Sequence, residues 1–114
     1  MRELSKAQLE IVLLMHHKGY SLVCNEGANY KCWLEDEQRN KVQFTIKRNT
    51  GDSLYSKGWI TSDLSVADLS RRFHHKLTDK AIRKLGYWYE SSKKKQELDS
   101  TLNYVLNKIV NKTK

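Results

Sequence analysis

The sequence predicts an α+β fold, with a helix near the amino-terminal end, extended segments in the middle and helices in the last third. Apolar residues recur at helical spacing before Gly19, alternate with polar residues between about residues 30 and 47, and return to helical spacing after residue 77. A chain of 114 residues can bury one modest core but not two. We therefore expect one compact domain.

The first helix has signals at both ends. Ser5 and Gln8 have the spacing of a capping box, in which each side chain satisfies a backbone N–H at the start of a helix. Gly19 is a usual helix stop. The sequence predicts a helix from about Ser5 to Lys18.

Alternation with a period of two predicts strands after this helix. Residues 30–34 alternate apolar and polar side chains, and the same pattern resumes over residues 42–46. Together they predict a β-hairpin, preceded by a turn over residues 25–29. Whether residues 21–24 form a further strand is left open.

A short helix is predicted over Thr50 to Lys57, with Gly58 as its stop. Gly51 weakens this prediction, because glycine disfavours a helix interior. The alternative is a hairpin turn over residues 49–52 with strands on both sides.

Residues 65–78 allow two incompatible interpretations. In the first, Arg71 to Leu77 is the last strand of a β-wing, and Thr78 caps the helix that follows. In the second, residues 65–73 form a helix, residues 74–77 form a turn, and Thr78 opens a recognition helix. The second interpretation rests on apolar residues at helical spacing, and the two assign different residues to a nucleic-acid contact.

The last part of the chain is predicted to be helical. A helix over about residues 78–90 is followed by residues 91–95, SSKKK, as the candidate break. We expect residues 1–90 to form the main domain and residues 91–114 an amphipathic helix, which either packs on that domain or makes a homodimer contact. Its apolar stripe consists of Leu98, Leu102, Val105, Leu106 and Ile109.

The formal net charge of +8 is concentrated at one end of the chain. Residues 1–70 contain nine lysines or arginines and nine acidic residues, whereas residues 71–114 contain twelve and four. A one-sided basic surface attracts polyanions, and nucleic acid is the commonest such partner for a small soluble protein. The alternative is a solvated tail that keeps the protein soluble.

Enzymatic and cofactor chemistry find no support in the sequence. It contains no glycine-rich phosphate loop, nucleophile elbow or paired-carboxylate spacing. Cys24 and Cys32 match no zinc-ligand spacing and are expected to be partly buried thiols in or near a hairpin, with a redox or metal role as the alternative. The two pairs of adjacent histidines diverge too far for either pair to hold one ion. We expect no enzyme, cofactor or metal.

The longest uninterrupted apolar run, Ile11 to Met15, is far shorter than the roughly 20 residues of a membrane span. There is also no secretory pattern of basic start, apolar centre and small-residue cleavage site. We expect a soluble, cytoplasmic protein with no membrane association.

Three phrases occur in an order typical of one family: LSKAQLEIVLLMHHKG near the start, LYSKGWI over residues 54–60, and RRFHHKLTDKA over residues 71–81. In this order the chain resembles winged-helix and helix-turn-helix DNA-binding proteins, such as MarR and PadR regulators and small phage winged-helix proteins. The family's glycine after Leu-Thr is Ala81 here, so the chain is expected to continue directly into a helix. The resemblance implies a winged-helix-like domain that binds duplex DNA.

The candidate contact residues follow from the two interpretations. With a wing, the short helix would lie in the major groove and the wing would reach phosphates or the minor groove. The corresponding residues are Lys47, Arg48 and Lys57 for the helix, and Arg71, Arg72 and Lys76 for the wing. With a recognition helix at Thr78, the contacts would be Lys80, Arg83 and Lys84, with Arg71 and Arg72 as backbone clamps in either case.

The function expected from charge and resemblance is that of a small DNA-binding protein, a transcriptional regulator of phage or mobile-element type. The alternative is a protein-interaction module on a winged-helix scaffold, such as a phage-type inhibitor or host-takeover factor, because a fold does not decide a function.

Overall fold

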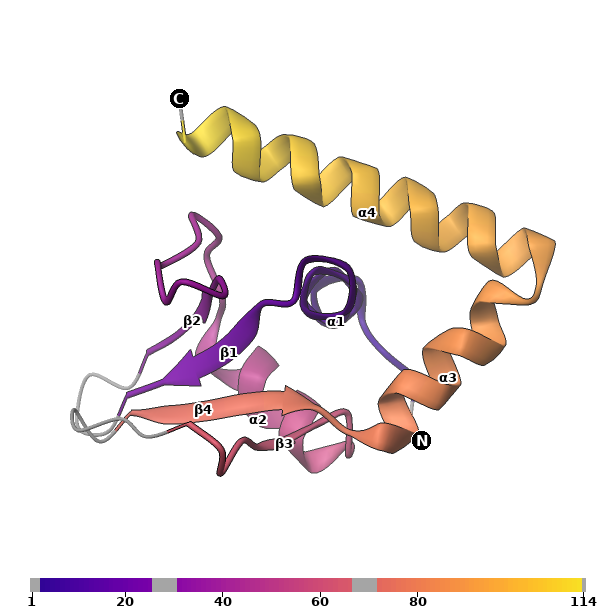
Figure 1. Cartoon of the computed structure of the whole chain (residues 1–114). Helices are drawn as coiled ribbons and strands as arrows, with labels where there is room; N and C mark the ends of the chain where they lie inside the picture. The colour runs from indigo at the N-terminus through magenta and orange to yellow at the C-terminus, as the bar shows by residue number, and fades with distance from the viewer. Residues whose placement is uncertain (1–2, 26–30, 67–71, 114) are drawn as a thin grey trace.

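A computed structural model describes residues 3–25, 31–66 and 72–113, and for residues 110–113 the backbone alone (Figure 1). Within these ranges it is an α+β domain with four helices and one four-stranded antiparallel sheet, in the order β2-β1-β4-β3, which confirms the predicted class. The elements are α1 (Lys6–Lys18), β1 (Ser21–Cys24), β2 (Cys32–Glu35), α2 (Arg48–Ser56), β3 (Ile60–Ser62), β4 (Phe73–Leu77), α3 (Asp79–Tyr89) and α4 (Ser92–Thr113).

Both ends of α1 are confirmed. The Ser5 hydroxyl accepts a hydrogen bond from the Gln8 backbone N–H, and the Gln8 side-chain oxygen accepts one from the Ser5 N–H. Gly19 ends the helix in the left-handed conformation, with φ of 70°. This position favours glycine because a Cβ is strained there.

The predicted hairpin of residues 30–34 with residues 42–46 is not a regular strand pair. β2 pairs with β1, whose formation the sequence left open, and residues 41–46 meet β2 through two isolated antiparallel bridges, Glu35 with Lys41 and Cys32 with Ile46, and through the Val42 N–H, which donates to the Leu34 carbonyl at 2.8 Å. The Phe44 N–H donates to the Val42 carbonyl, and this γ-turn breaks the extended backbone. The alternation arises because these side chains pack against the core without a paired strand.

β4 decides between the two interpretations of residues 65–78. Phe73 pairs with Cys24 of β1, and Leu77 pairs with Ile60 of β3. A helix that reaches Phe73 is therefore wrong, and a strand followed by a capped helix is confirmed for residues 73–78; Arg71 lies outside the described residues. The apolar residues at helical spacing did not produce a helix here, because strand pairing on both sides satisfies the backbone hydrogen bonds of a central strand.

The short helix near residue 50 is present as α2, so the alternative hairpin turn over residues 49–52 is wrong. Gly51, which weakened that prediction, lies where α2 approaches the sheet. A Cβ at this position would come 3.2 Å from Cys32 Sγ and 3.7 Å from a Leu22 methyl. Glycine at this position disfavours the helix, but its lack of a side chain allows α2 to lie close to the strands.

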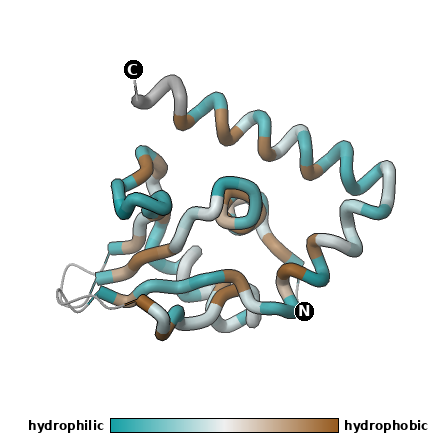
Figure 2. Tube along the Cα trace, in the orientation of Figure 1, coloured by the Kyte–Doolittle hydropathy of each residue, from teal (hydrophilic) through white to brown (hydrophobic). Residues whose placement is uncertain are grey.

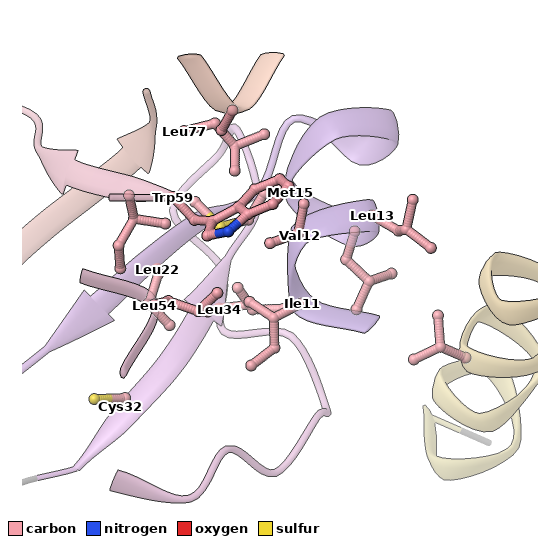
Figure 3. Close-up of a cluster of buried hydrophobic side chains, with 14 of the residues drawn as sticks. Ile11, Val12, Leu13, Met15, Leu22, Cys32, Leu34, Leu54, Trp59 and Leu77 are labelled. Carbon is pink, nitrogen blue, oxygen red and sulfur yellow. The ribbon is translucent and has the colours of Figure 1, made fainter. Parts of the chain in front are cut away.

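α1 lies between the sheet and α4, as Figure 1 shows. Its inner side meets the sheet and α2 around Trp59, which is fully buried (Figure 3). α4 turns its hydrophobic positions toward α1 (Figure 2). Of the predicted apolar stripe, Leu98, Val105 and Ile109 are buried, and Leu102 and Leu106 pack against the same core.

Residues 91–95 were the predicted break between the two last helices, but α4 already begins at Ser92. The Ser91 carbonyl accepts a hydrogen bond from Lys95 N–H, and its hydroxyl accepts one from Lys94 N–H at 3.5 Å, so the lysines belong to the helix. A homodimer through the stripe remains a prediction, and these side chains would first have to leave the domain core. Among the described residues, no helix is long and apolar enough to cross a membrane.

Thr78 joins the sheet to α3, and its replacement gives a stability test. Its hydroxyl accepts a hydrogen bond from Ala81 N–H at 3.1 Å and donates one to the Gly58 carbonyl at 2.8 Å. We expect Thr78→Ala to lower the free energy of unfolding by about 1 to 2 kcal/mol, measured by urea denaturation. Thr101→Ala is the control, because Thr101 only donates to a carbonyl one turn back in α4. Equal losses in both variants would contradict the role of Thr78.

Candidate nucleic-acid interface

α3 presents one face to the core and the opposite face to solvent. Thr78 caps the helix, and Ala81 and Leu85, four residues apart, are fully buried. Because the helix is anchored on this side, its other side has a defined orientation. The side chains on the exposed side line a shallow surface and are Lys80, Arg83, Lys84 and Tyr87.

This exposed face carries an excess of positive charge. Asp79 is the acidic residue of the first turn of α3, but within the part of the chain that the structure describes, no carboxylate lies within salt-bridge distance of Lys80 or Arg83. Tyr87 is 74% exposed one turn beyond Arg83. Lysine and arginine beside an exposed aromatic ring is a combination that suits phosphates and bases.

Trp88 connects this face to α4. The Lys84 ammonium lies 5.8 Å from the centre of the indole ring, and the Lys94 ammonium of α4 lies 4.7 Å from it. Lys94 also lies 3.7 Å from Glu97. The sequence prediction assigned no specific role to Lys94, and its position in the lysine run at residues 93–95 was the only available signal.

Lys57 was predicted to contact DNA from the short helix, but its ammonium makes hydrogen bonds near the start of α1. Its ammonium donates to the Gln8 side-chain oxygen at 2.8 Å and to the Glu3 carbonyl at 3.0 Å. Gln8 in turn donates to the Ser53 hydroxyl of α2. Lys57 therefore holds α2 and the amino-terminal end of α1 together.

The other α2 candidates remain at the surface. Lys47 and Arg48 are exposed at the start of the helix, but the acidic side chain of Asp52 is exposed one turn later. This surface therefore carries less excess positive charge than the face of α3.

Arg72 precedes β4 and contacts a buried acid. Its guanidinium lies 3.5 Å from Glu35, whose other neighbour is the Trp33 indole N–H, donating at 2.8 Å. The Glu35 side chain is only 5% exposed, so Arg72 supplies charge that this carboxylate needs. Lys76 is exposed on β4, and Arg71 lies outside the described residues. The predicted residues are thus divided among α2, β4 and α3, and only Lys80, Arg83 and Lys84 share one helix face.

Comparisons of the chain with protein families, with curated proteins and with solved structures find no match. The resemblance to winged-helix proteins therefore remains a prediction from the three sequence phrases.

His75 of β4 adds little positive charge near neutral pH. Burial lowers the pKa of His75 below its ordinary 6.5, and a like charge on His74 lowers it further, while a hydrogen bond to the Leu22 carbonyl opposes these effects. His75 is thus neutral at pH 7, and its ring packs edge-on against Tyr55.

The lowered pKa of His75 makes stability depend on pH. Below about pH 6.5 the unfolded chain binds a proton at this residue that the folded chain does not, so the free energy of unfolding falls as the pH falls. We expect His75→Gln to reduce this fall between pH 7 and pH 5, measured by urea denaturation at several pH values. An unchanged slope in His75→Gln would contradict the assignment.

Proposed function

We propose that this chain is a small DNA-binding protein, of the kind that regulates transcription in phages or mobile elements, and that it contacts duplex DNA through α3. The observation that carries this proposal is the exposed basic face formed by Lys80, Arg83 and Lys84 on a helix anchored in the core. A fixed row of cations can meet several phosphates at once without first ordering a loop.

The chemistry of the three side chains supports a division of roles. Lys80 and Lys84 are point charges suited to phosphates, whereas the planar guanidinium of Arg83 can bind a phosphate or the edge of a guanine through two hydrogen bonds. Tyr87 extends the same face by one turn.

The start of α4 also supports a polyanionic partner. Lys93, Lys94 and Lys95 lie in or next to its first turn, which contains no acidic residue. Cations there oppose the helix dipole and weaken the helix. A bound phosphate near this helix end would remove that repulsion.

The order of elements is consistent with the winged-helix resemblance. α1, β1, β2, α2, β3 and β4 follow one another, and β4 lies between β1 and β3 in the sheet. In the winged-helix arrangement β3 and β4 would be the wing and α2 the helix in the major groove, so the choice of α3 rests on its basic face and not on the resemblance. Lys76 on β4 then leads directly into the basic face of α3.

A comparison of two triple variants tests the proposal. Lys80→Ala, Arg83→Ala and Lys84→Ala together should weaken binding to a duplex by at least about tenfold at moderate salt, and should reduce the slope of log K against log salt by about one per lost phosphate contact. The matched control, Lys18→Ala, Lys47→Ala and Arg48→Ala, removes the same charge from exposed positions on other elements. Binding is measured by fluorescence anisotropy over a salt series.

The second triple variant compares the face of α3 with the predicted contacts Lys47 and Arg48 at the start of α2. Equal losses in the two triple variants would contradict a contact made chiefly through α3, and a larger loss in the second variant would move the contact to α2. Absence of duplex binding at low salt in the unaltered chain would refute the proposed function.

A second candidate function is favoured by the apolar groups on the same helix. Tyr87 and Ile82 are 74% and 45% exposed, and exposed aromatic side chains near an arginine are frequent in protein interfaces. The partner would then be an acidic protein surface.

Nuclease treatment distinguishes the two functions. The chain is used to capture partners from a host lysate before and after complete digestion of nucleic acid. A stoichiometric protein that survives digestion and is lost with Tyr87→Ala supports the protein-interaction function. Capture that disappears on digestion supports DNA binding.

A further inference from the structure

Cys24 and Cys32 face each other across the β1–β2 hairpin. They are direct partners in the strand register, and their sulfur atoms lie 2.7 Å apart. Both residues are buried, at 3% and 6% exposure, and both are thiols. They are eight residues apart in the sequence, and the hairpin brings them side by side in space.

The backbone geometry around the two cysteines suits a disulfide. The Asn25 N–H donates to the Lys31 carbonyl at 3.1 Å, so Asn25 and Lys31 form a hydrogen-bonded pair. Hydrogen-bonded and non-hydrogen-bonded pairs alternate along antiparallel strands, which makes Cys24 and Cys32 a non-hydrogen-bonded pair. Such pairs have Cα atoms about 4.5 Å apart, at the near end of the disulfide range of about 4.4 to 6.8 Å.

We propose that Cys24 and Cys32 are a reversible oxidation site, which forms a cross-strand disulfide by exchange with a low-molecular-weight disulfide. The thiolate of one cysteine attacks one sulfur of the reagent and releases its first thiolate. The thiolate of the other cysteine then attacks the protein sulfur of the mixed disulfide and releases the second. The two protein thiols are oxidised, the reagent disulfide is reduced to two thiols, and the two protons from the cysteines go to these products.

Both sulfurs belong to residues that line a surface pocket. Cys24 lines one pocket together with Tyr55 and His75, and Cys32 lines another together with Trp33 and Phe44. Either cysteine can therefore meet a small reagent first, and the other then resolves the mixed disulfide.

The disulfide would make the folded domain more stable, because it would link β1 to β2 covalently. A cross-link across a loop of this length limits the unfolded chain and stabilises the folded one. The site does not depend on DNA binding, since neither sulfur lies on α3.

The test treats the folded full-length chain with oxidised glutathione over a series of glutathione redox buffers. We expect the intact mass to lose two hydrogen atoms, a peptide map to show the bond between Cys24 and Cys32, and the melting temperature to rise by at least about 5 °C. Dithiothreitol should restore both the original mass and the original melting temperature.

Two serine variants test the two-step exchange. In Cys32→Ser the exchange should stop at a glutathione adduct on Cys24, and in Cys24→Ser it should stop at an adduct on Cys32. The unaltered chain gives a result even if a variant fails to fold. Thiols that persist in the folded chain but react after unfolding in guanidinium would overturn the proposal. A stable glutathione adduct or a disulfide-linked dimer as the end product would also overturn it.

Discussion

The pairing of β4 with β1 on one side and β3 on the other is the constraint on which the rest of the structure depends. It places the backbone of residues 73–77 in the middle of the sheet, where both edges find hydrogen-bond partners. Because the strand ends at Leu77, Thr78 must begin α3. Ala81 and Leu85 are buried in the core, and this fixes the orientation of α3 about its own axis. In this orientation the basic side chains point to solvent. A different end of β4 would bury a different face of the helix.

The sequence predicted elements whose signals are local and complete. The capping box at Ser5 and the stop at Gly19 define α1, and Thr78 was recognised as a cap under both interpretations. The wrong predictions have a common cause, which is that contacts between segments distant in the sequence decided the secondary structure. Residues 42–46 alternate like a strand because they pack on the core, and residues 65–73 have helical spacing although Phe73 pairs in the sheet. Periodicity reports which side of a segment is buried, but it does not report whether a neighbouring strand is available.

The candidate site shows the same limit for charged residues. The charge asymmetry identified the part of the chain that contains α3, and the spacing of Lys80, Arg83 and Lys84 predicted one helix face. The sequence could not separate these residues from Lys57 and Arg72, which have the same chemistry but hold Gln8 and Glu35. That distinction depends on partners 49 and 37 residues away in the chain. Long-range contacts of this kind leave no periodic pattern in a sequence.

The position of Trp88 between the ammonium groups of Lys84 and Lys94 gives the chain an internal optical probe. Indole emission responds to nearby charge, and a polyanion that draws either lysine away from the ring would change that charge. The other two indoles are Trp59, whose ring centre lies 5.4 Å from that of Trp88, and Trp33, which has Lys41 over its ring, so the signal of Trp88 is taken as the difference from a Trp88→Phe variant. Occupancy of the basic face can therefore be followed in the unlabelled protein, by the wavelength of its own fluorescence.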